Sequence, residues 1–210
     1  MNSNIINNNN ISRSRKRKMK RNIRAFYHCV ILVALSSILS LLPIVKMENG
    51  GAVTVLSLLP VLTIGVKFGY KWGMGSSIVF MALQIVQGVF VDEVFVSLQT
   101  TGAIIACVIL DYVIPYSILG LTAFAMPERK KRPDAIKILA TFAVLIFIAF
   151  LSHFISGMTV WGQWDDGFAG AFLHSLKYNG SYMGIEFALT ITVSGLMLAT
   201  RQFSGLITDR

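Results

Sequence analysis

Long apolar stretches alternate with short polar connections along most of this chain. Crossing the hydrocarbon core of a bilayer takes roughly 20 helical residues, and six stretches reach or approach that length. Their predicted bounds are Ala25–Val45, Val53–Gly69, Trp72–Val91, Gly102–Met126, Ile136–Val160 and Tyr182–Ala199. The pattern therefore predicts an all-α fold, an integral membrane bundle of six transmembrane helices with no room for a soluble catalytic domain.

Composition supports a membrane domain. Of the 210 residues, 54% are hydrophobic and 14% charged, and the mean hydropathy is +0.65. Soluble domains usually carry about 25% charged residues.

The placement of Lys and Arg predicts the orientation. With six spans, 17 of the 19 basic residues fall on one side, and Lys46 and Lys177 fall on the other. Basic residues collect on the cytoplasmic side of membrane proteins, so both termini are predicted to be cytoplasmic. The outer loops then form a mildly acidic face that favours a cationic solute, with Glu48, Asp92, Glu93, Asp165 and Asp166.

Three regions follow from this pattern. Residues 1–24 form an Asn-rich and then basic cytoplasmic tail that is predicted to be disordered, 25–201 the membrane domain, and 202–210 a short cytoplasmic tail. A basic segment directly before a span is typical of an orientation signal that contacts anionic lipid headgroups, so we predict no nucleic-acid partner. Cys29 and Cys107 both fall within spans, which indicates neither a disulfide nor a metal site.

Asp111 lies alone in an apolar run, and an ionisable group within a span marks a functional site by default. Counting inward from the cytoplasmic ends places Asp111 and His153 at similar depths, about one helical turn inside the outer surface. His153, Gly157 and Trp161 follow at i, i+4 and i+8, along one helix face. A similar stripe begins the last span with Asn179, Tyr182 and Glu186. The combination predicts a cavity open to the outside.

Most of these residues also fit purely structural roles. Trp161, Trp164, Tyr178 and Tyr182 fit interface anchors at helix ends, and Gly157 fits close helix packing. His153 fits a packing histidine, and Glu186 could pair with a neighbouring helix.

An intramembrane enzyme is another possible class. It would need a nucleophile and a base, for which serines such as Ser152 and His153 are available, but neither a G-x-S-x-G nor an H-E-x-x-H motif is present.

Two motifs carry a resemblance to a known family. They are His153-Phe-Ile-Ser-Gly157-Met-Thr-Val-Trp161-Gly162 and Ser175-Leu-Lys-Tyr178-Asn179-Gly-Ser-Tyr182-Met183. Together with Leu110-Asp111-Tyr112, they resemble the thiamine-specific substrate-binding subunits (S-components, ThiT family) of energy-coupling-factor vitamin transporters. The similarity runs from about Ala25 to Ala199.

The resemblance implies a transport subunit, not an enzyme, that binds thiamine with high affinity from outside and needs no cofactor. Asp111 and Asn179 would address the aminopyrimidine, with Tyr112 beside the acid and His153, Gly157 and Trp161 lining the rest. The implied substrate-binding set is Asp111, Tyr112, His153, Gly157, Trp161, His174, Tyr178 and Asn179. The implied partners are a membrane coupling subunit and two cytoplasmic ATPases, in keeping with the lack of a G-x-x-x-x-G-K-[ST] loop in this chain.

The chain also departs from the family pattern. His174 stands where the family has a stacking tyrosine, and residues 43–51 lack the tryptophan that acts as a lid. Gly184-Ile185 replaces a proline-containing continuation, and the alanine-xxx-alanine docking pattern of the first helix is not intact. These changes leave open an alternative, a binder of a different vitamin or of a thiamine precursor such as hydroxymethylpyrimidine.

Overall fold

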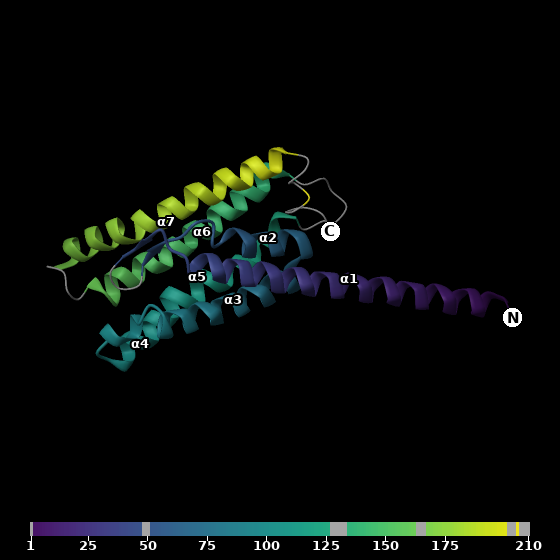
Figure 1. Cartoon of the computed structure of the whole chain (residues 1–210), viewed down its shortest axis with the longest axis horizontal. Helices are drawn as coiled ribbons and strands as arrows, with labels where there is room; N and C mark the ends of the chain where they lie inside the picture. The colour runs from purple at the N-terminus through teal and green to yellow at the C-terminus, as the bar shows by residue number, and fades with distance from the viewer. Residues whose placement is uncertain (1, 48–50, 127–133, 163–166, 201–204, 206–210) are drawn as a thin grey trace.

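The computed structural model describes residues 2–47, 51–126, 134–162, 167–200 and 205, and it is built mainly of helices (Figure 1). The elements are α1 (Asn2–Ser40), β1 (Val45–Lys46), β2 (Ala52–Val53), α2 (Leu59–Phe68), α3 (Tyr70–Phe90), η2 (Val94–Ser97), α4 (Thr101–Cys107), η3 (Val108–Val113), α5 (Ile114–Ser117), η4 (Ile118–Ala125), α6 (Ala135–Thr159) and α7 (Gly167–Ala199). The strands β1 and β2 pair antiparallel in a short hairpin.

Five helical stretches of the described residues are long and apolar enough to cross a membrane. They are Ser12–Ser40, Tyr70–Phe90, Thr101–Ala125, Ala135–Thr159 and Gly167–Ala199. The predicted all-α membrane bundle is confirmed at this level, whereas the prediction of six spanning helices is not.

The second predicted span, Val53–Gly69, is wrong as a single helix. Its first residues form β2 and a turn in which Leu56 has a positive φ of 59°, and α2 then covers only ten residues. Proline is tolerated in the first turn of a helix, where its missing N–H needs no partner, so Pro60 favours a helix that begins at Leu59. At the other end, Gly69 adopts a φ of 86° and stops the helix.

The fourth predicted span is helical throughout but changes its winding three times. The α-helical turns of α4 pass into the π-helical segment η3, then into α5 and the 3₁₀-helical η4. In a π-turn the carbonyl of Leu110 would accept from the N–H five residues later, at Pro115, which has none. Ser152 Oγ of α6 donates to this carbonyl instead, at 2.6 Å. The irregular winding therefore places Asp111, inside η3, against α6.

Two helices begin earlier than predicted. The structure starts α7 at Gly167 rather than at Tyr182, so that Tyr178 and Asn179 lie within the helix. The tail that we predict to be disordered continues α1 back to Asn2. Its side chains from Ser12 to Arg24 are exposed, so packing does not fix this segment, and the division of the chain at residue 24 stays a prediction.

Short α2 lies inside the bundle, buried along nearly its whole length, against α3 and η4. Glycines make this packing possible. A Cβ on Gly65 of α2 would lie 2.8 Å from the backbone nitrogen of Ala123 in η4, and one on Gly73 of α3 would lie 2.8 Å from Gly65 Cα. Small residues let membrane helices approach closely, and here they hold a half-length helix within protein rather than lipid.

Several residues used in the sequence predictions lie outside the described residues. They are Glu48, Trp164, Asp165 and Asp166, and six of the 17 basic residues counted on the cytoplasmic side: Arg129, Lys130, Lys131, Arg132, Arg201 and Arg210.

Candidate functional site

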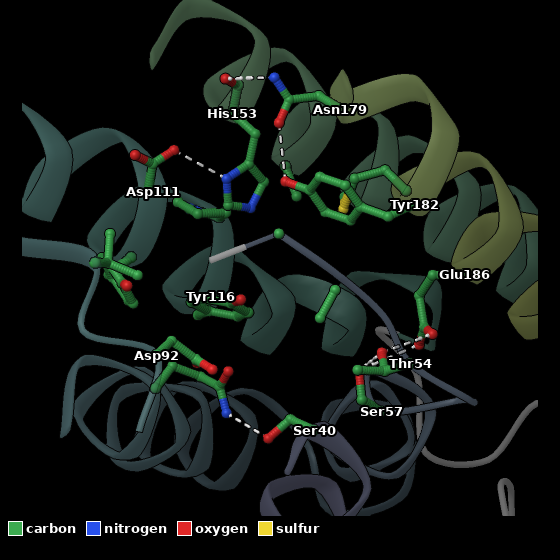
Figure 2. A pocket seen from close by; sticks show the side chains of 18 of the residues that line it. Ser40, Thr54, Ser57, Asp92, Asp111, Tyr116, His153, Asn179, Tyr182 and Glu186 are labelled. Atoms are coloured by element: carbon green, nitrogen blue, oxygen red, sulfur yellow. Dashed lines mark hydrogen bonds and ion pairs between the residues drawn. The ribbon is translucent and has the colours of Figure 1, made fainter. Parts of the chain in front are cut away.

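A cavity of about 130 Å³ opens between α1, α3, η3, α5, α6, α7 and residues 51–58 (Figure 2). We call residues 51–58 the wall segment, since Gly51, Ala52, Thr54, Ser57 and Leu58 all line the cavity. A single water needs roughly 10–15 Å³ on the same measure, so a molecule of many heavy atoms fits. All eight predicted binding residues lie in the lining: Asp111, Tyr112, His153, Gly157, Trp161, His174, Tyr178 and Asn179.

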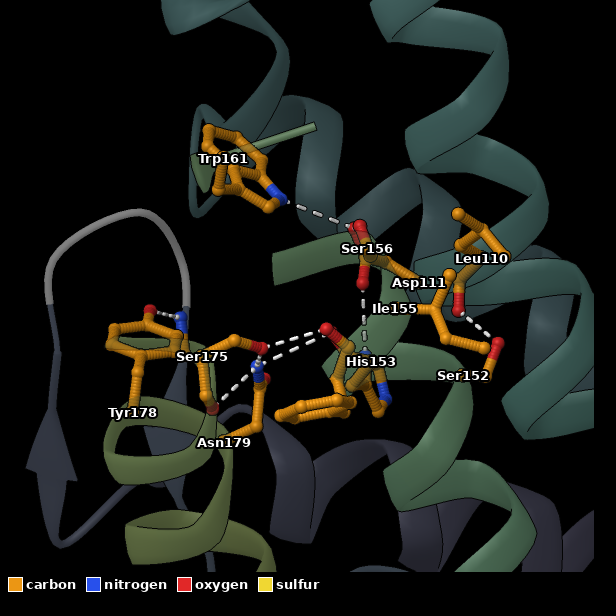
Figure 3. Close-up of polar contacts among 12 residues, drawn as sticks. Leu110, Asp111, Ser152, His153, Ile155, Ser156, Trp161, Ser175, Tyr178 and Asn179 are labelled. Carbon is orange, nitrogen blue, oxygen red and sulfur yellow. Dashed lines mark hydrogen bonds and ion pairs between the residues drawn. The ribbon is translucent and has the colours of Figure 1, made fainter. Parts of the chain in front are cut away.

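Asp111 is the centre of a cluster of side-chain donors (Figure 3). Ser156 Oγ donates to Oδ2 at 2.5 Å, and Trp161 Nε1 donates to the same oxygen at 3.3 Å. His153 Nδ1 lies 3.1 Å from Oδ1. A carboxylate offers about four lone-pair sites, so Asp111 can accept hydrogen bonds from several donors at once. Asp111 and His153, which were predicted to lie at similar depths, are direct neighbours in the structure.

Asn179 joins α7 to α6 at the level of His153. Its Nδ2 donates to the carbonyl oxygen of His153 at 3.2 Å, and its Oδ1 accepts from Tyr182 Oη at 2.9 Å. Gly157 makes this contact possible, because a Cβ there would lie 2.8 Å from Asn179 Nδ2 and 2.3 Å from Ser175 Oγ. The predicted close-packing role of Gly157 therefore holds alongside its place in the cavity lining.

Aromatic rings cover much of the cavity surface. The rings of Tyr116 and Tyr182 meet the His153 ring edge to face, with centroids 6.3 and 6.2 Å away. His174 and Tyr178 stack with an interplanar angle of 12° and a centroid distance of 5.9 Å. His174, which stands in place of the family tyrosine, thus supplies a flat ring at the cavity wall. Tyr116 was missed by the sequence reasoning, although it lies one turn beyond Tyr112.

Tyr178 also holds the wall segment. Its Oη accepts a hydrogen bond from the Gly51 N–H at 2.8 Å (Figure 3). A Cβ on Gly51 would lie 2.4 Å from this oxygen, so the contact requires glycine. One edge of the wall segment is therefore fixed to α7.

Glu186, whose role the sequence leaves open, fixes the other edge. Its Oε1 accepts from the Leu58 N–H at 3.0 Å and lies 3.4 Å from Ser57 Oγ, while Thr54 Oγ1 donates to Oε2 at 3.1 Å. Leu58 is the N-cap residue of α2 and has no capping side chain of its own. A carboxylate from α7 therefore caps the start of α2, where the helix dipole favours negative charge.

A second polar group in the lining was missed by the sequence reasoning. Ser40, Gln84, Gln87 and Asp92 form a hydrogen-bonded chain across the cavity from Asp111, and Asp92 pairs with Lys46 at 3.2 Å. The signal was available, because Gln84 and Gln87 are polar residues one turn apart within the predicted span Trp72–Val91.

These features define a membrane-embedded bundle with a deep aromatic and acidic pocket for a small solute. The family model for thiamine transporter protein (Thia_YuaJ) matches residues 26–204, and the chain belongs to this family. It is therefore a multi-pass membrane transport subunit and not an enzyme, and the resemblance to thiamine-specific S-components is confirmed.

Two relatives agree with this assignment. The thiamine transporter ThiT of Bacillus subtilis (strain 168) is 25% identical over 162 residues, which cover 74% of this chain and 79% of that protein. The structure of ThiT from Listeria monocytogenes superposes with a TM-score of 0.63, covering 86% of this chain and 96% of the other. At 16% identity, the second match supports the fold alone.

Proposed function

We propose that this chain binds thiamine with high affinity from the outside of the cell and delivers it as the S-component of an energy-coupling-factor transporter. The observation that carries the proposal is Asp111, which faces an aromatic-lined cavity in a chain of the thiamine transporter family.

The pocket chemistry suits this ligand. Thiamine offers an amino group and ring nitrogens, which a carboxylate and an amide match in a site shielded from water. Asp111 and Asn179 are the two groups that would address this aminopyrimidine ring. The thiazolium is a permanent cation, and an indole face such as that of Trp161 attracts cations by about 0.5–2 kcal/mol. His153, Gly157, His174 and Tyr178 would complete the surface around the ligand, with Tyr112 beside the acid.

The proposed topology has both termini in the cytoplasm. Five long helices, together with the wall segment and α2 as one further crossing, give an even number of crossings. In Figure 1, α1 begins and α7 ends toward the same end of the bundle. The basic residues between Arg13 and Arg24 would then contact anionic lipid headgroups on the cytoplasmic face.

A ligand panel on the purified chain in detergent tests the binding function. Thiamine should quench tryptophan fluorescence with a dissociation constant below about 1 μM, and it should be recovered unchanged. Tighter binding of hydroxymethylpyrimidine would favour the precursor alternative, for which the stacked His174–Tyr178 pair is the supporting observation. Absence of thiamine binding by folded protein would contradict the proposal.

Transport should require a membrane coupling subunit and two cytoplasmic ATPases. The sequence carries no phosphate-binding G-x-x-x-x-G-K-[ST] loop, so the chain has no such means of using ATP. Purified chain alone in liposomes should bind external thiamine without concentrating it. Concentrative uptake by the lone subunit would contradict this partnership.

A further inference from the structure

Ser156 differs from the other described donors to Asp111 in its place relative to the cavity. The three donors are Ser156, Trp161 and His153. The rings of His153 and Trp161 line the cavity, whereas Ser156 is 0% exposed and lies outside the described lining (Figure 3). A ligand that fills the cavity therefore meets the two rings directly but does not meet the Ser156 hydroxyl.

The Ser156 hydroxyl also makes the shortest of the three contacts. Its Oγ donates to Asp111 Oδ2 at 2.5 Å, compared with 3.3 Å from Trp161 Nε1 to the same oxygen and 3.1 Å between His153 Nδ1 and Oδ1. Hydrogen bonds to a carboxylate are shorter and stronger than bonds between neutral groups. The bond from Ser156 therefore selects one of the staggered orientations that the Asp111 side chain could adopt.

A second serine of α6 holds the backbone beside Asp111. Ser152 Oγ donates to the carbonyl oxygen of Leu110, the residue before the acid, at 2.6 Å. Ser152 and Ser156 are four residues apart, so they lie on the same face of α6. The two hydroxyls thus hold η3 at a main-chain group and at the adjacent carboxylate, and neither serine belongs to the described cavity lining.

The backbone of Ser156 contacts Trp161 independently of the side chain. The Ser156 carbonyl oxygen accepts from the N–H of Val160 at 2.8 Å and from the N–H of Trp161 at 3.3 Å, where α6 ends. Alanine at position 156 would keep these backbone bonds and lose only the bond to Asp111. A single oxygen atom can therefore be removed without releasing the turn that carries the indole.

We propose that Ser156 is a positioning residue, which directs the Asp111 carboxylate toward the amino group of the ligand without contacting the ligand. The inference rests on the proposed thiamine function, in which Asp111 addresses the aminopyrimidine. A binding group that is already held in its productive orientation loses less entropy when the ligand arrives. Without the Ser156 hydroxyl, the carboxylate would sample other rotamers, and the ligand's amino group would lose most of the benefit.

Two ligands test this role on the full-length protein by calorimetric titration: thiamine, and the analogue with hydrogen in place of the pyrimidine amino group. The wild type should prefer thiamine by about tenfold to a hundredfold, as expected for a hydrogen bond to a charged group. Ser156→Ala should bind thiamine about threefold to thirtyfold more weakly and the analogue within about twofold of wild type. Its preference for thiamine should shrink by the same factor.

Ser194→Ala is the matched control. Ser194 is also 0% exposed, and its Oγ has no hydrogen-bond partner within the described part of the chain, so alanine there should leave the preference unchanged. A Ser156→Ala protein that loses affinity equally for both ligands has only lost packing, and this result overturns the positioning role. Unchanged thiamine affinity in Ser156→Ala overturns it as well.

A double-mutant cycle tests the same role without the analogue. In the Asp111→Ala background there is no carboxylate to direct, so adding Ser156→Ala should change thiamine affinity by less than about twofold. A loss as large as that in the wild-type background would show that Ser156 acts independently of Asp111 and would overturn the proposal. Failure of thiamine to bind folded wild-type protein contradicts the proposed function itself, and the role of Ser156 with it.

Discussion

Two carboxylates reach the same cavity and have different surroundings. Asp111 is half-buried and meets the side chains of His153, Ser156 and Trp161, which belong to α6 and the turn after it. Glu186 is buried, and its hydrogen bonds join it to Thr54, Ser57 and the backbone N–H of Leu58, all in the wall segment. Because both are ionisable residues within predicted spans, the sequence alone would mark both equally as candidate functional residues.

The two carboxylates differ in the groups that donate hydrogen bonds to them. The donors around Asp111 are side chains, and two of them, His153 and Trp161, are rings that themselves line the cavity. The donors around Glu186 include a helix-start N–H, which has a fixed direction. We infer that Asp111 acts in ligand binding, whereas Glu186 holds the wall segment and the start of α2 in place. Neutralising each in turn tests this division.

The largest effect is expected from Asp111→Asn, which keeps the size of the side chain but removes its charge. A charge-assisted hydrogen bond shielded from water contributes about 1.5–3 kcal/mol, so thiamine affinity should fall about tenfold to a hundredfold or more. Fluorescence titration measures this loss. The matched control is Glu186→Gln, the same chemical change at the other acid, which should stay within about threefold of wild type because the amide can still cap α2. Unchanged affinity in folded Asp111→Asn would assign that residue a structural role.

Trp161→Ala should come next. Loss of the cation–π contribution predicts about a twofold to thirtyfold weaker affinity for thiamine, and a smaller loss for uncharged hydroxymethylpyrimidine. Trp161→Phe separates the ring face from the hydrogen bond to Asp111, because it keeps the first and removes the second. Equal losses for the charged and uncharged ligands would show that the ring acts by packing or through Asp111.

Glu186→Ala should lower stability more than affinity. It removes the α2 cap and leaves buried donors unpaired, at a cost of about 1–3 kcal/mol in the free energy of unfolding. Thermal unfolding in detergent should shift downward, and thiamine binding should weaken severalfold as the wall segment loosens. If Glu186→Gln weakens binding as much as Glu186→Ala, the charge serves the ligand, and the division between the two acids is wrong.

Tyr178→Phe should give the smallest effect. It removes the acceptor of the Gly51 N–H and keeps the ring that stacks on His174. A neutral hydrogen bond contributes about 0.5–1.5 kcal/mol, so affinity should fall about twofold to tenfold. Stopped-flow measurements should show most of this change in the dissociation rate. Ser181→Ala, on the same helix but outside the cavity lining, is the control and should bind normally.

Much of the cavity was predictable because membrane spans make polar residues conspicuous. Asp111 and His153 were placed at the same depth by counting residues, and the structure brings them to 3.1 Å. The winding of η3 was not predictable, since it depends on Ser152 of another helix reaching the Leu110 carbonyl. The role of Glu186 was hidden for the same reason, because its partners are more than 125 residues away in sequence. Local sequence patterns predict where polar side chains lie. They do not show which backbone groups, distant in the sequence, those side chains bind.

Burial of α2 has a consequence for how the protein enters the membrane during synthesis. Ten residues span about 15 Å, half of the roughly 30 Å hydrocarbon core, so α2 is too short to partition into lipid as an independent unit. Gly69 joins it directly to α3, and the two should insert together as a hairpin. The α2 contacts with η4 form only once the fourth span has been made, so the nascent chain must hold a half-length helix beside α3 until the later segments arrive.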